Sequence, residues 1–229
     1  MTTIANLQQY LKNARFYAGT IDGAFGPKTK DALMQCLAAG PDTPITTDNV
    51  AKAAAAISCS AAQVRTVWKV EAAGAGFFQG LPKILFEGHI FSRLTSGKYD
   101  QSHPGISYPT WDKSKYPSTQ GGRYEQLMEA VSLDPDAAFQ AASYGAFQIL
   151  GQNFKMCGFA SAFEFVLAMC QSEGAQLLAF VNFVKARGID TALRRCDWAA
   201  FAKGYNGAAY AANHYDTLLA NAYSRESKG

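Results

Sequence analysis

Apolar residues recur at the spacing of an α-helix through most of this 229-residue chain, and that repeat limits the possible folds more than any other feature. Ile4, Leu7 and Leu11 share one face of a first segment, and similar faces return in the C-terminal part of the chain. Residues 75–125 differ, because their glycines, prolines and aromatic residues show no sustained period. The pattern predicts a mainly α-helical protein in which this middle stretch is irregular, with room for a short β-hairpin.

A run of turn-forming residues, Gly-Pro-Asp-Thr-Pro at 40–44, is the best candidate for a domain boundary. It predicts a short helical module over residues 1–40, a linker over 41–46 and a main domain over 47–229. Inside the module, a turn-rich loop precedes a second helix that starts at Pro27. So short a module buries little apolar surface alone, and we expect it to pack against the main domain or to borrow a third helix.

The main domain is predicted to consist of helices whose start signals are visible in the sequence. Thr46, Thr47 and Asp48 are suited to cap an alanine-rich helix that ends at Ile57. Later helices are predicted from Ser60 to Gly74, from Asp134-Pro135, from the capping-box pattern Ser161 to Glu164, over Leu177 to Gly188, from Asp197 to Gly204, and over Tyr210, His214 and Leu218.

The composition is that of a compact globular protein and argues against several kinds of partner. Hydrophobic residues make up 48% and charged residues 17% of the chain, which excludes a disordered or polyelectrolyte protein. The formal net charge of +3 favours an anionic partner such as a bacterial wall. Because Lys and Arg form no block, we expect no nucleic-acid binding, and we expect a monomer.

Cysteine usage and the N-terminal residues predict a protein that folds in a cytoplasm. The five cysteines are odd in number, scattered and not paired with histidine, which predicts reduced thiols and no metal site; no cofactor is expected. The first residues lack the basic start and apolar run of a signal peptide, and no segment approaches membrane-spanning length. If the substrate lies outside the inner membrane, a separate route must release the protein.

Glu71 has the setting that says most about chemistry. It shares a predicted helix face with Val64, Val67 and Trp68, and it falls in the last helical turn. Burial and the negative end of the helix dipole both favour its protonated form. A carboxyl that is protonated near neutral pH is what a glycosidase uses to protonate the departing glycosidic oxygen. The alternative is a Glu at a frayed helix end whose carboxylate simply reaches water.

Two further clusters place amide groups beside aromatic residues, Ser-Tyr-Gly-Ala-Phe-Gln-Ile at 143–149 and Tyr-Asn-Gly at 205–207. Taken singly, each is typical of structural hydrogen bonding or packing. Their order after Glu71 resembles the three-motif signature of goose-type lysozymes and soluble lytic transglycosylases. In that signature a Glu is followed by a Gly-Leu-Met-Gln-Ile-like segment and then by an Ala-Tyr-Asn-like segment.

Residues 47–223 resemble more closely the N-acetylmuramidase domain of modular phage endolysins. The matching stretches are Val70-Glu71 with Gly74, Gly76 and Phe77, the long run 83–95, residues 143–151 and residues 197–207. The resemblance implies an α-helical, lysozyme-like catalytic domain. It also implies an enzyme that is made in the host cytoplasm and lyses the host wall after release across the inner membrane, without inserting into it.

Residues 4–37 resemble the first part of a helical peptidoglycan-binding module, whose signature loop reads Asp-Gly-x-Phe-Gly-Pro-x-Thr. The chain matches this loop at Asp22, Gly23, Phe25, Gly26, Pro27 and Thr29. The resemblance implies that these loop residues bind the bacterial peptidoglycan. The alternative is an ordinary two-turn connection between helices.

For the main domain, the resemblance implies hydrolysis of the bond between N-acetylmuramic acid and N-acetylglucosamine, with Glu71 as general acid. The residues implied to line the sugar subsites are Tyr144, Gln148, Tyr205, Asn206 and His89. His89 is alternatively a structural histidine. Glu87 fits two roles equally: a second carboxylate that activates water, which predicts inversion at the sugar, or a partner of Lys83 or Arg93 in a core salt bridge.

Two other functions remain open at this stage. A lytic transglycosylase needs one catalytic Glu, because the sugar's own hydroxyl attacks, and it leaves an anhydro-sugar instead of a reducing end. A non-catalytic wall-binding protein is favoured by Ala72 and Ala73, which stand where the family usually has a Ser after its Glu. A peptidase is not expected, because no Cys/His or His/Asp pairing is visible.

Overall fold

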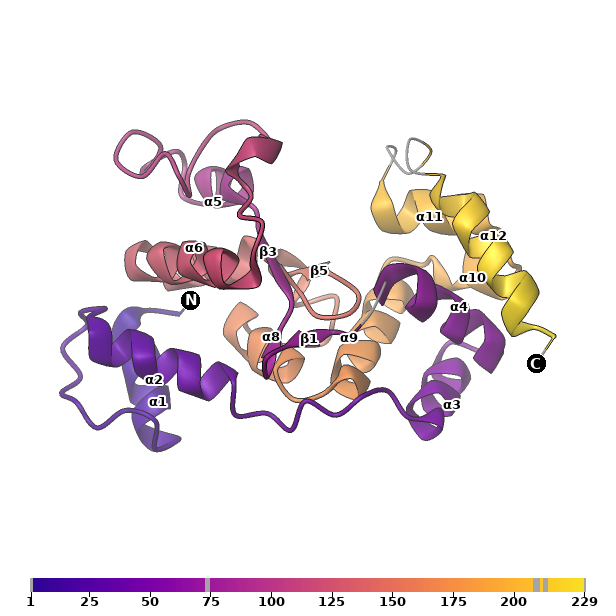
Figure 1. Ribbon diagram of the computed structural model, residues 1–229, viewed down its shortest axis with the longest axis horizontal. Helices are drawn as coiled ribbons and strands as arrows, with labels where there is room; N and C mark the ends of the chain where they lie inside the picture. Colours follow the sequence, from indigo (N-terminus) through magenta and orange to yellow (C-terminus); the bar gives the residue numbers. More distant parts are fainter. Residues whose placement is uncertain (1, 73–74, 208–210, 212–213, 229) are drawn as a thin grey trace.

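The computed structural model describes residues 2–72, 75–207, 211 and 214–228, and these form a mainly α-helical protein, as predicted. Figure 1 shows the arrangement of the elements. The helices are α1 (Ile4–Asn13), α2 (Pro27–Leu37), α3 (Thr47–Ala56), α4 (Ala61–Ala72), α5 (Gly88–Leu94), α6 (Gln120–Leu133), α7 (Pro135–Gln140), α8 (Ala162–Met169), α9 (Glu173–Ala186), α10 (Asp190–Arg194), α11 (Trp198–Asn206) and α12 (Tyr215–Glu226). The strands are β1 (Phe77–Phe78), β2 (Leu81–Pro82), β3 (Ile84–Phe86), β4 (Ala142–Tyr144) and β5 (Ile149–Leu150), and two 3₁₀ turns are η1 (Lys113–Lys115) and η2 (Gly151–Asn153).

Side-chain caps place the helix starts where the sequence predicts them. Thr46 Oγ1 accepts the Asn49 N–H at 3.1 Å and caps α3, and Ser161 Oγ accepts the Glu164 N–H at 3.1 Å and caps α8. Asp134 caps α7 in the same way. Each cap satisfies one of the backbone N–H groups that the first turn of a helix leaves without a partner.

Two helices begin inside the stretch predicted to be irregular, and that prediction is wrong for them. The seven residues of α5 are too few to show a helical period, although Phe91 is fully buried. Thr119 caps the start of α6, but the first turn contains Gly121 and Gly122, which are poor helix formers and hide the helix in the sequence. The short hairpin expected in this stretch is present as β1 and β2.

Helix ends in the C-terminal part also differ from the prediction. Helix α11 continues past Gly204 to Asn206, because Gly204 packs against Ile189 and does not break the helix. His214 has a left-handed backbone with φ of 50° and precedes α12 instead of belonging to it. The predicted helix end at Gly74 and the predicted helical residue Tyr210 lie outside the described residues.

The N-terminal module packs against the main domain, as its small size led us to expect. Leu7 and Leu33 are fully buried in the same hydrophobic core as the helices of the main domain. The rings of Tyr10 and Phe163 meet edge to face at 5.1 Å between centroids. In Figure 1, α1 and α2 lie below α6, and Lys30 of α2 pairs with an exposed Glu of α6 at 2.5 Å. The module therefore shares a core with the rest of the chain.

A buried amide organises the signature loop of the module. Gln8 is fully buried, and its Oε1 accepts the N–H groups of Asp22 and Gly23 at 3.1 and 2.9 Å. Its Nε2 donates to Asp22 Oδ1 at 2.8 Å and to Thr29 Oγ1 at 3.1 Å. The hydrogen bond from Gln8 also lowers the pKa of the Asp22 carboxyl. The loop is therefore wrapped around the Gln8 side chain of α1, and the Gln8 amide forms hydrogen bonds with the polar groups of the loop.

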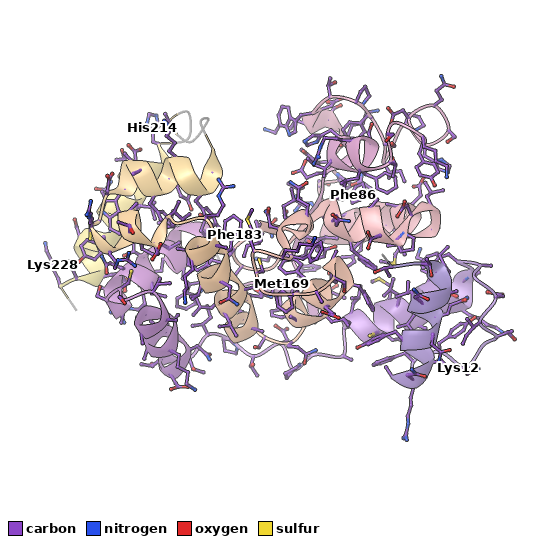
Figure 2. All side chains as sticks on the ribbon, turned by 180° about the vertical axis from the view of Figure 1, so that it is seen from behind. Lys12, Phe86, Met169, Phe183, His214 and Lys228 are labelled. Atoms are coloured by element: carbon purple, nitrogen blue, oxygen red, sulfur yellow. The ribbon has the colours of Figure 1, made fainter. Side chains whose placement is uncertain are left out.

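A small three-stranded antiparallel sheet lies at the centre of the main domain, in the order β3-β4-β5. Ile84 of β3 pairs with Tyr144 of β4, and Tyr144 also pairs with Ile149 of β5. Figure 2 places Phe86 of β3 and Met169 of α8 in the middle of the molecule, and both are buried. The sheet therefore fixes the segment 142–150 against the core.

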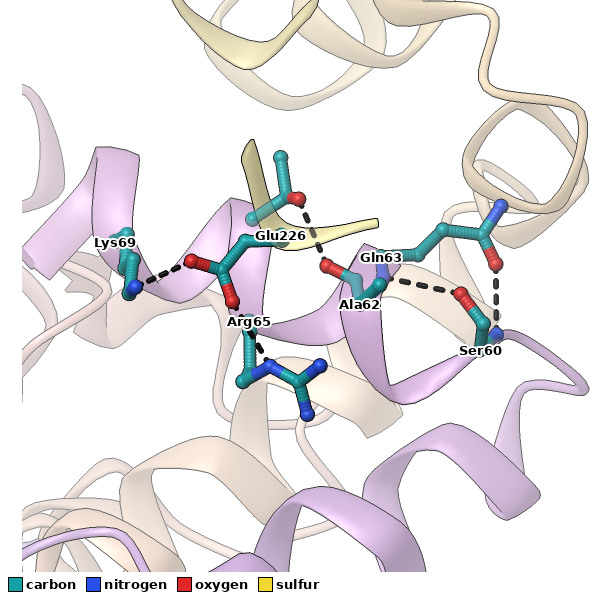
Figure 3. Close-up of polar contacts among 7 residues, drawn as sticks. Ser60, Ala62, Gln63, Arg65, Lys69 and Glu226 are labelled. Carbon is teal, nitrogen blue, oxygen red and sulfur yellow. Dashed lines mark hydrogen bonds and ion pairs between the residues drawn. The ribbon is translucent and has the colours of Figure 1, made fainter. Parts of the chain in front are cut away.

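Helix α4 is anchored at both ends, as Figure 3 shows. At its start, Gln63 and Ser60 exchange hydrogen bonds at 2.7 and 3.2 Å, which confirms the predicted cap. Towards its end, Arg65 and Lys69 both pair with Glu226 of α12, Arg65 at 2.9 Å. Helix α4, which carries Glu71, is thus held in place by contacts that do not involve Glu71.

The five cysteines carry free thiols, and three of them are buried. Burial raises the pKa of the Cys36 thiol to about 11, so it stays protonated and behaves as a small apolar side chain. Among the described residues, no helix is both long and apolar enough to cross a membrane.

The Gln8 network predicts that Gln8→Ala destabilises the protein, because the fully buried amide that joins the loop to α1 is lost and the N–H groups of Asp22 and Gly23 lose their acceptor. We expect a loss of roughly 2–4 kcal/mol in the free energy of unfolding, measured by denaturant titration of the full chain. Gln9→Ala is the matched control, because Gln9 is exposed and bonds only Asn13; it is expected to cost less than about 0.5 kcal/mol. Equal effects of the two variants would contradict this account of the loop.

Candidate active site

Glu71 lies in the last turn of α4 and lines a cavity of about 170 Å³. The helix face that carries it is apolar, as predicted, with Val64 and Val67 fully buried and Trp68 packed against the core. The other residues around this cavity are Phe147, Gln148, Ile149, Leu150, Asn153, Phe183, Tyr205 and Asn206. The structure therefore gathers Glu71 and the two predicted polar clusters around one space.

The Glu71 carboxyl is poorly solvated. Its Oε1 is buried and has no hydrogen-bond partner among the described residues, although the residue as a whole keeps some exposure. Burial raises the pKa of Glu71 to about 8. The position at the C-terminal end of α4 disfavours the anion in the same direction. The alternative of a frayed end reaching water does not fit this geometry, and the carboxyl holds a proton at neutral pH.

Tyr205 and Asn206, at the end of α11, form the opposite side of this cavity. The Tyr205 hydroxyl donates to the Phe147 carbonyl at 2.8 Å, and its ring stacks on Phe201 at 5.8 Å with an interplanar angle of 9°. Burial, and then the charge of Glu71, raise the pKa of Tyr205 well above its usual value. Tyr205 is thus a fixed wall beside Glu71, whereas Asn206 is exposed to an incoming ligand.

Gln148 lies where two cavities meet. It adopts a left-handed backbone with φ of 45°, which is uncommon outside glycine, in a turn that follows Gly145. Its Nε2 donates to the Gly145 carbonyl at 2.8 Å, and its Oε1 accepts from the Ser143 hydroxyl at 3.1 Å. These bonds hold the amide in one orientation on the floor of the site.

The second cavity, of about 460 Å³, shares Gln148 and Leu150 with the Glu71 cavity. Its remaining residues are Leu85, Glu87, His89, Ile90, Trp111 and Ser143. The two cavities are therefore adjacent, and together they are called the cleft. The structure brings the predicted residues Glu87, His89 and Gln148 to the same part of it.

Glu87 immediately precedes α5, and its partners differ from those that the sequence suggested. Its Oε2 accepts a hydrogen bond from the Tyr116 hydroxyl and lies 3.5 Å from His89 Nδ1. Neither Lys83 nor Arg93 pairs with it, so the core salt bridge is wrong. The reason is that Arg93 points elsewhere, to Gln152 at 2.6 Å. Glu87 is left with a largely buried carboxylate on the cleft wall.

Tyr144, predicted from the family resemblance to line a sugar subsite, lies in the core instead. Its ring is 1% exposed and packs edge to face on Phe165, 5.7 Å between centroids. Its hydroxyl donates to the Phe139 carbonyl at 3.2 Å. The residue sits on β4, where alternate side chains point to opposite faces, so Ser143 faces the cleft and Tyr144 does not.

The loop residues predicted to bind the wall fall into two groups, those that hold the loop together and those on its outer part. Asp22 and Thr29 bond Gln8, and Thr29 is buried, so these side chains hold the loop together. Gly23, Phe25 and Gly26 form its outer part and keep some exposure. A cavity of about 310 Å³ lies elsewhere on the module, lined by Phe16, Tyr17, Ala18, Gly19, Lys28, Asp31, Ala32 and Gln35.

Two polar residues in the first turn of α9, which the sequence analysis missed, hold both walls of the cleft. Glu173 is 5% exposed; its Oε1 accepts the N–H of Gly76, and its Oε2 accepts the N–H of Ile45 at 3.2 Å. Gln176 is 1% exposed, and its Oε1 accepts the N–H of Ala146 at 2.7 Å. Gly76 follows Glu71 in the chain, and Ala146 precedes Gln148. Helix α9 therefore fixes the backbone near both of these candidate site residues.

The fit around Gln176 requires glycine at two places. A Cβ on Gly76 would lie 2.3 Å from Gln176 Oε1, and a Cβ on Gly145 would lie 2.5 Å from the carbon of the same amide. Gly145 also has a φ of 73°, which favours glycine. The sequence signal that points to these residues is a Glu and a Gln, three positions apart, on a segment that is otherwise apolar.

Comparison with known proteins decides the family. The profile of the N-acetylmuramidase family matches residues 60–227, which include the whole cleft. The chain belongs to the N-acetylmuramidase family. Residues 2–36 match a second family, described as "Putative peptidoglycan binding domain".

Among solved structures, the muramidase is similar to the crystal structure of the Burkholderia AP3 phage endolysin. The two chains share 35% identity with a TM-score of 0.76, over 98% of this chain and 94% of that one. No curated protein sequence matches significantly. The muramidase is thus a peptidoglycan hydrolase of the glycosidase class, it acts on the bacterial cell wall, and peptidoglycan is its partner.

The α9 contacts predict that Glu173→Gln impairs the muramidase. A Gln keeps one acceptor but turns an NH₂ group towards one of two backbone N–H donors, so one charged hydrogen bond is lost and the backbone beside Glu71 shifts. We expect a loss of roughly 1.5–3 kcal/mol in stability and about 10- to 100-fold in kcat on purified peptidoglycan.

Glu164→Gln is the matched control, because Glu164 also accepts a backbone N–H in the first turn of a helix but is exposed. It is expected to change stability by less than about 0.5 kcal/mol and to leave kcat unchanged. A Glu173→Gln protein with full kcat would show that Gly76 is held in place by other contacts.

Proposed function

We propose that Glu71 is the general acid of this muramidase. Its carboxyl has the three properties that the role requires: it lines the cleft, its Oε1 has no hydrogen-bond donor among the residues that the structure describes, and burial raises its pKa to about 8. A carboxyl that is still protonated at neutral pH donates its proton to the glycosidic oxygen as the bond from that oxygen to the sugar carbon breaks. The raised pKa is the single observation that carries the proposal.

Glu87 is the proposed second carboxylate. It lies on the wall of the same cleft, and its Oε2 accepts a hydrogen bond from the Tyr116 hydroxyl, which orients the carboxylate. In the proposed reaction, a water oxygen bonds to the anomeric carbon while its proton passes to Glu87. The pair of proton transfers leaves a reducing sugar end and inverts the anomeric configuration.

Around this chemistry, Gln148 and Asn206 present amide groups, and His89 an imidazole, to the hydroxyl and N-acetyl groups of the glycan. Tyr205 forms a fixed wall of the Glu71 cavity. The outer loop residues Gly23, Phe25 and Gly26 are the proposed contacts of the N-terminal module with the wall. The protein then has two parts, a wall-binding module and a catalytic domain, divided at residues 41–46. The similarity to a phage endolysin supports a lytic role: synthesis in the host cytoplasm, release across the inner membrane, and lysis of the host cell.

The acid assignment predicts that Glu71→Gln lowers kcat on purified peptidoglycan by about 10²- to 10⁴-fold, because an amide cannot supply the proton. For the native protein, kcat/KM is expected to hold up to about pH 8 and to fall above it, since the active carboxyl is the protonated one and its pKa in the free protein is about 8. Mass spectrometry of the released fragments should find reducing muramic-acid ends.

Glu125→Gln is the control, since Glu125 is an exposed carboxylate on α6 away from the cleft. Its kcat and pH profile should match those of the native protein. Anhydro-sugar ends would assign the reaction to a lytic transglycosylase, with attack by the sugar's own hydroxyl. Near-native turnover by Glu71→Gln would remove the acid role from this residue.

The second-carboxylate assignment predicts that Glu87→Gln lowers kcat by about 10²-fold or more with little change in KM, because the amide keeps the shape but cannot take a proton from water. Tyr116→Phe removes the hydrogen bond and keeps the carboxylate, so its loss should be smaller. NMR of the first-formed product should show the anomer opposite to that of the substrate. A Glu87→Gln protein that changes only KM would place Glu87 among the binding residues.

A further inference from the structure

Trp111 is an aromatic side chain on the cleft wall to which the sequence signature assigns no role. It is 61% exposed, the most of any large apolar side chain in the part of the chain that the structure describes. It lines the second cavity together with Glu87 and His89. So large an apolar surface in contact with water, placed inside a cleft and not on the outer surface, indicates a ligand that covers it.

The indole is held in place without being covered. Its ring meets the Tyr116 ring edge to face, 6.3 Å between centroids, and the Tyr116 hydroxyl donates to Glu87. Farther along the same loop, the Lys115 carbonyl accepts a hydrogen bond from Gln126 of α6 at 2.9 Å. The loop is therefore tied to the rest of the main domain at Lys115 and at Tyr116, and the exposed face of Trp111 is preorganised.

The surroundings of Trp111 select the chemical class of the ligand. One wall of the cavity is a flat apolar ring, and the other walls present a carboxylate from Glu87, an imidazole from His89, a hydroxyl from Ser143 and an amide from Gln148. A pyranose ring matches this arrangement, because it has an apolar C–H face and hydrogen-bonding groups at its edge. A volume of about 460 Å³ suits one such ring with its substituents.

We propose that Trp111 is the stacking platform of a saccharide subsite adjacent to the Glu71 cavity. The two cavities share Gln148 and Leu150, so a single glycan strand can occupy both. One sugar unit lies against the indole while the bond to be cleaved lies at Glu71. This inference rests on the proposed function of the cleft and adds a determinant of how long a stretch of glycan the muramidase recognises.

The binding test uses the full-length Glu71→Gln protein, in which glycan fragments are not cleaved, and follows its tryptophan fluorescence. A peptidoglycan hexasaccharide is expected to change the emission, and Trp111→Phe in the same background is expected to remove most of that change, although Trp68 and Trp198 remain. Trp111→Ala should weaken hexasaccharide binding about tenfold and disaccharide binding far less. Trp111→Tyr should recover most of the affinity, because it restores an aromatic face.

Leu178→Ala is the matched control, since Leu178 is 60% exposed and lines a different cavity, beside α3. Unchanged hexasaccharide affinity in Trp111→Ala would overturn the proposal, and so would an equal loss for fragments of every length. If the Glu71→Gln protein still cleaves glycan, the acid assignment fails, but the comparison of Trp111 variants at low temperature still decides whether the subsite exists.

Discussion

The cleft depends on one buried carboxylate at the start of α9. Glu173 accepts backbone N–H groups from Gly76, which follows the candidate acid in the chain, and from Ile45, in the segment that leads into the main domain. A buried carboxylate is stable only when donors satisfy both of its oxygens, and here the donors come from two distant segments. Fold and site are therefore linked through a residue that does not face the substrate.

The same packing sets the chemistry of Glu71. Val64 and Val67 draw α4 into the core, the ion pairs of Glu226 hold it from outside, and the last turn of the helix then ends at the cleft. Because no donor in the described part of the chain reaches Glu71 Oε1, burial acts on the carboxyl without compensation from those residues. The raised pKa follows from how the helix is held, and not from a neighbouring charge.

Local patterns in the sequence predicted most of the helices and the setting of Glu71, because helix caps and apolar faces are encoded within a few positions, whereas the roles of Gln148, Tyr205 and Asn206 were implied by the family resemblance. Glu71, Gln148, Tyr205 and Asn206 were all predicted, and the structure brings them together. Three kinds of feature were not predicted from the sequence: the face of β4 that buries Tyr144, the hydrogen-bond partners of Glu87, and the roles of Glu173 and Trp111. Each depends on which distant segments meet, and a single sequence does not encode that in its local pattern.

The shared core of the two parts has a mechanical consequence. A wall-binding module on a long flexible tether lets a catalytic domain search many bonds around one anchor point, at a local concentration set by tether length. Here Leu7 and Leu33 belong to the same core as the catalytic helices, and Tyr10 packs on Phe163. If the module binds the wall as proposed, the cleft therefore reaches only the glycan strands that the rigid shape of the molecule brings to it, and reaching further strands requires the module to dissociate.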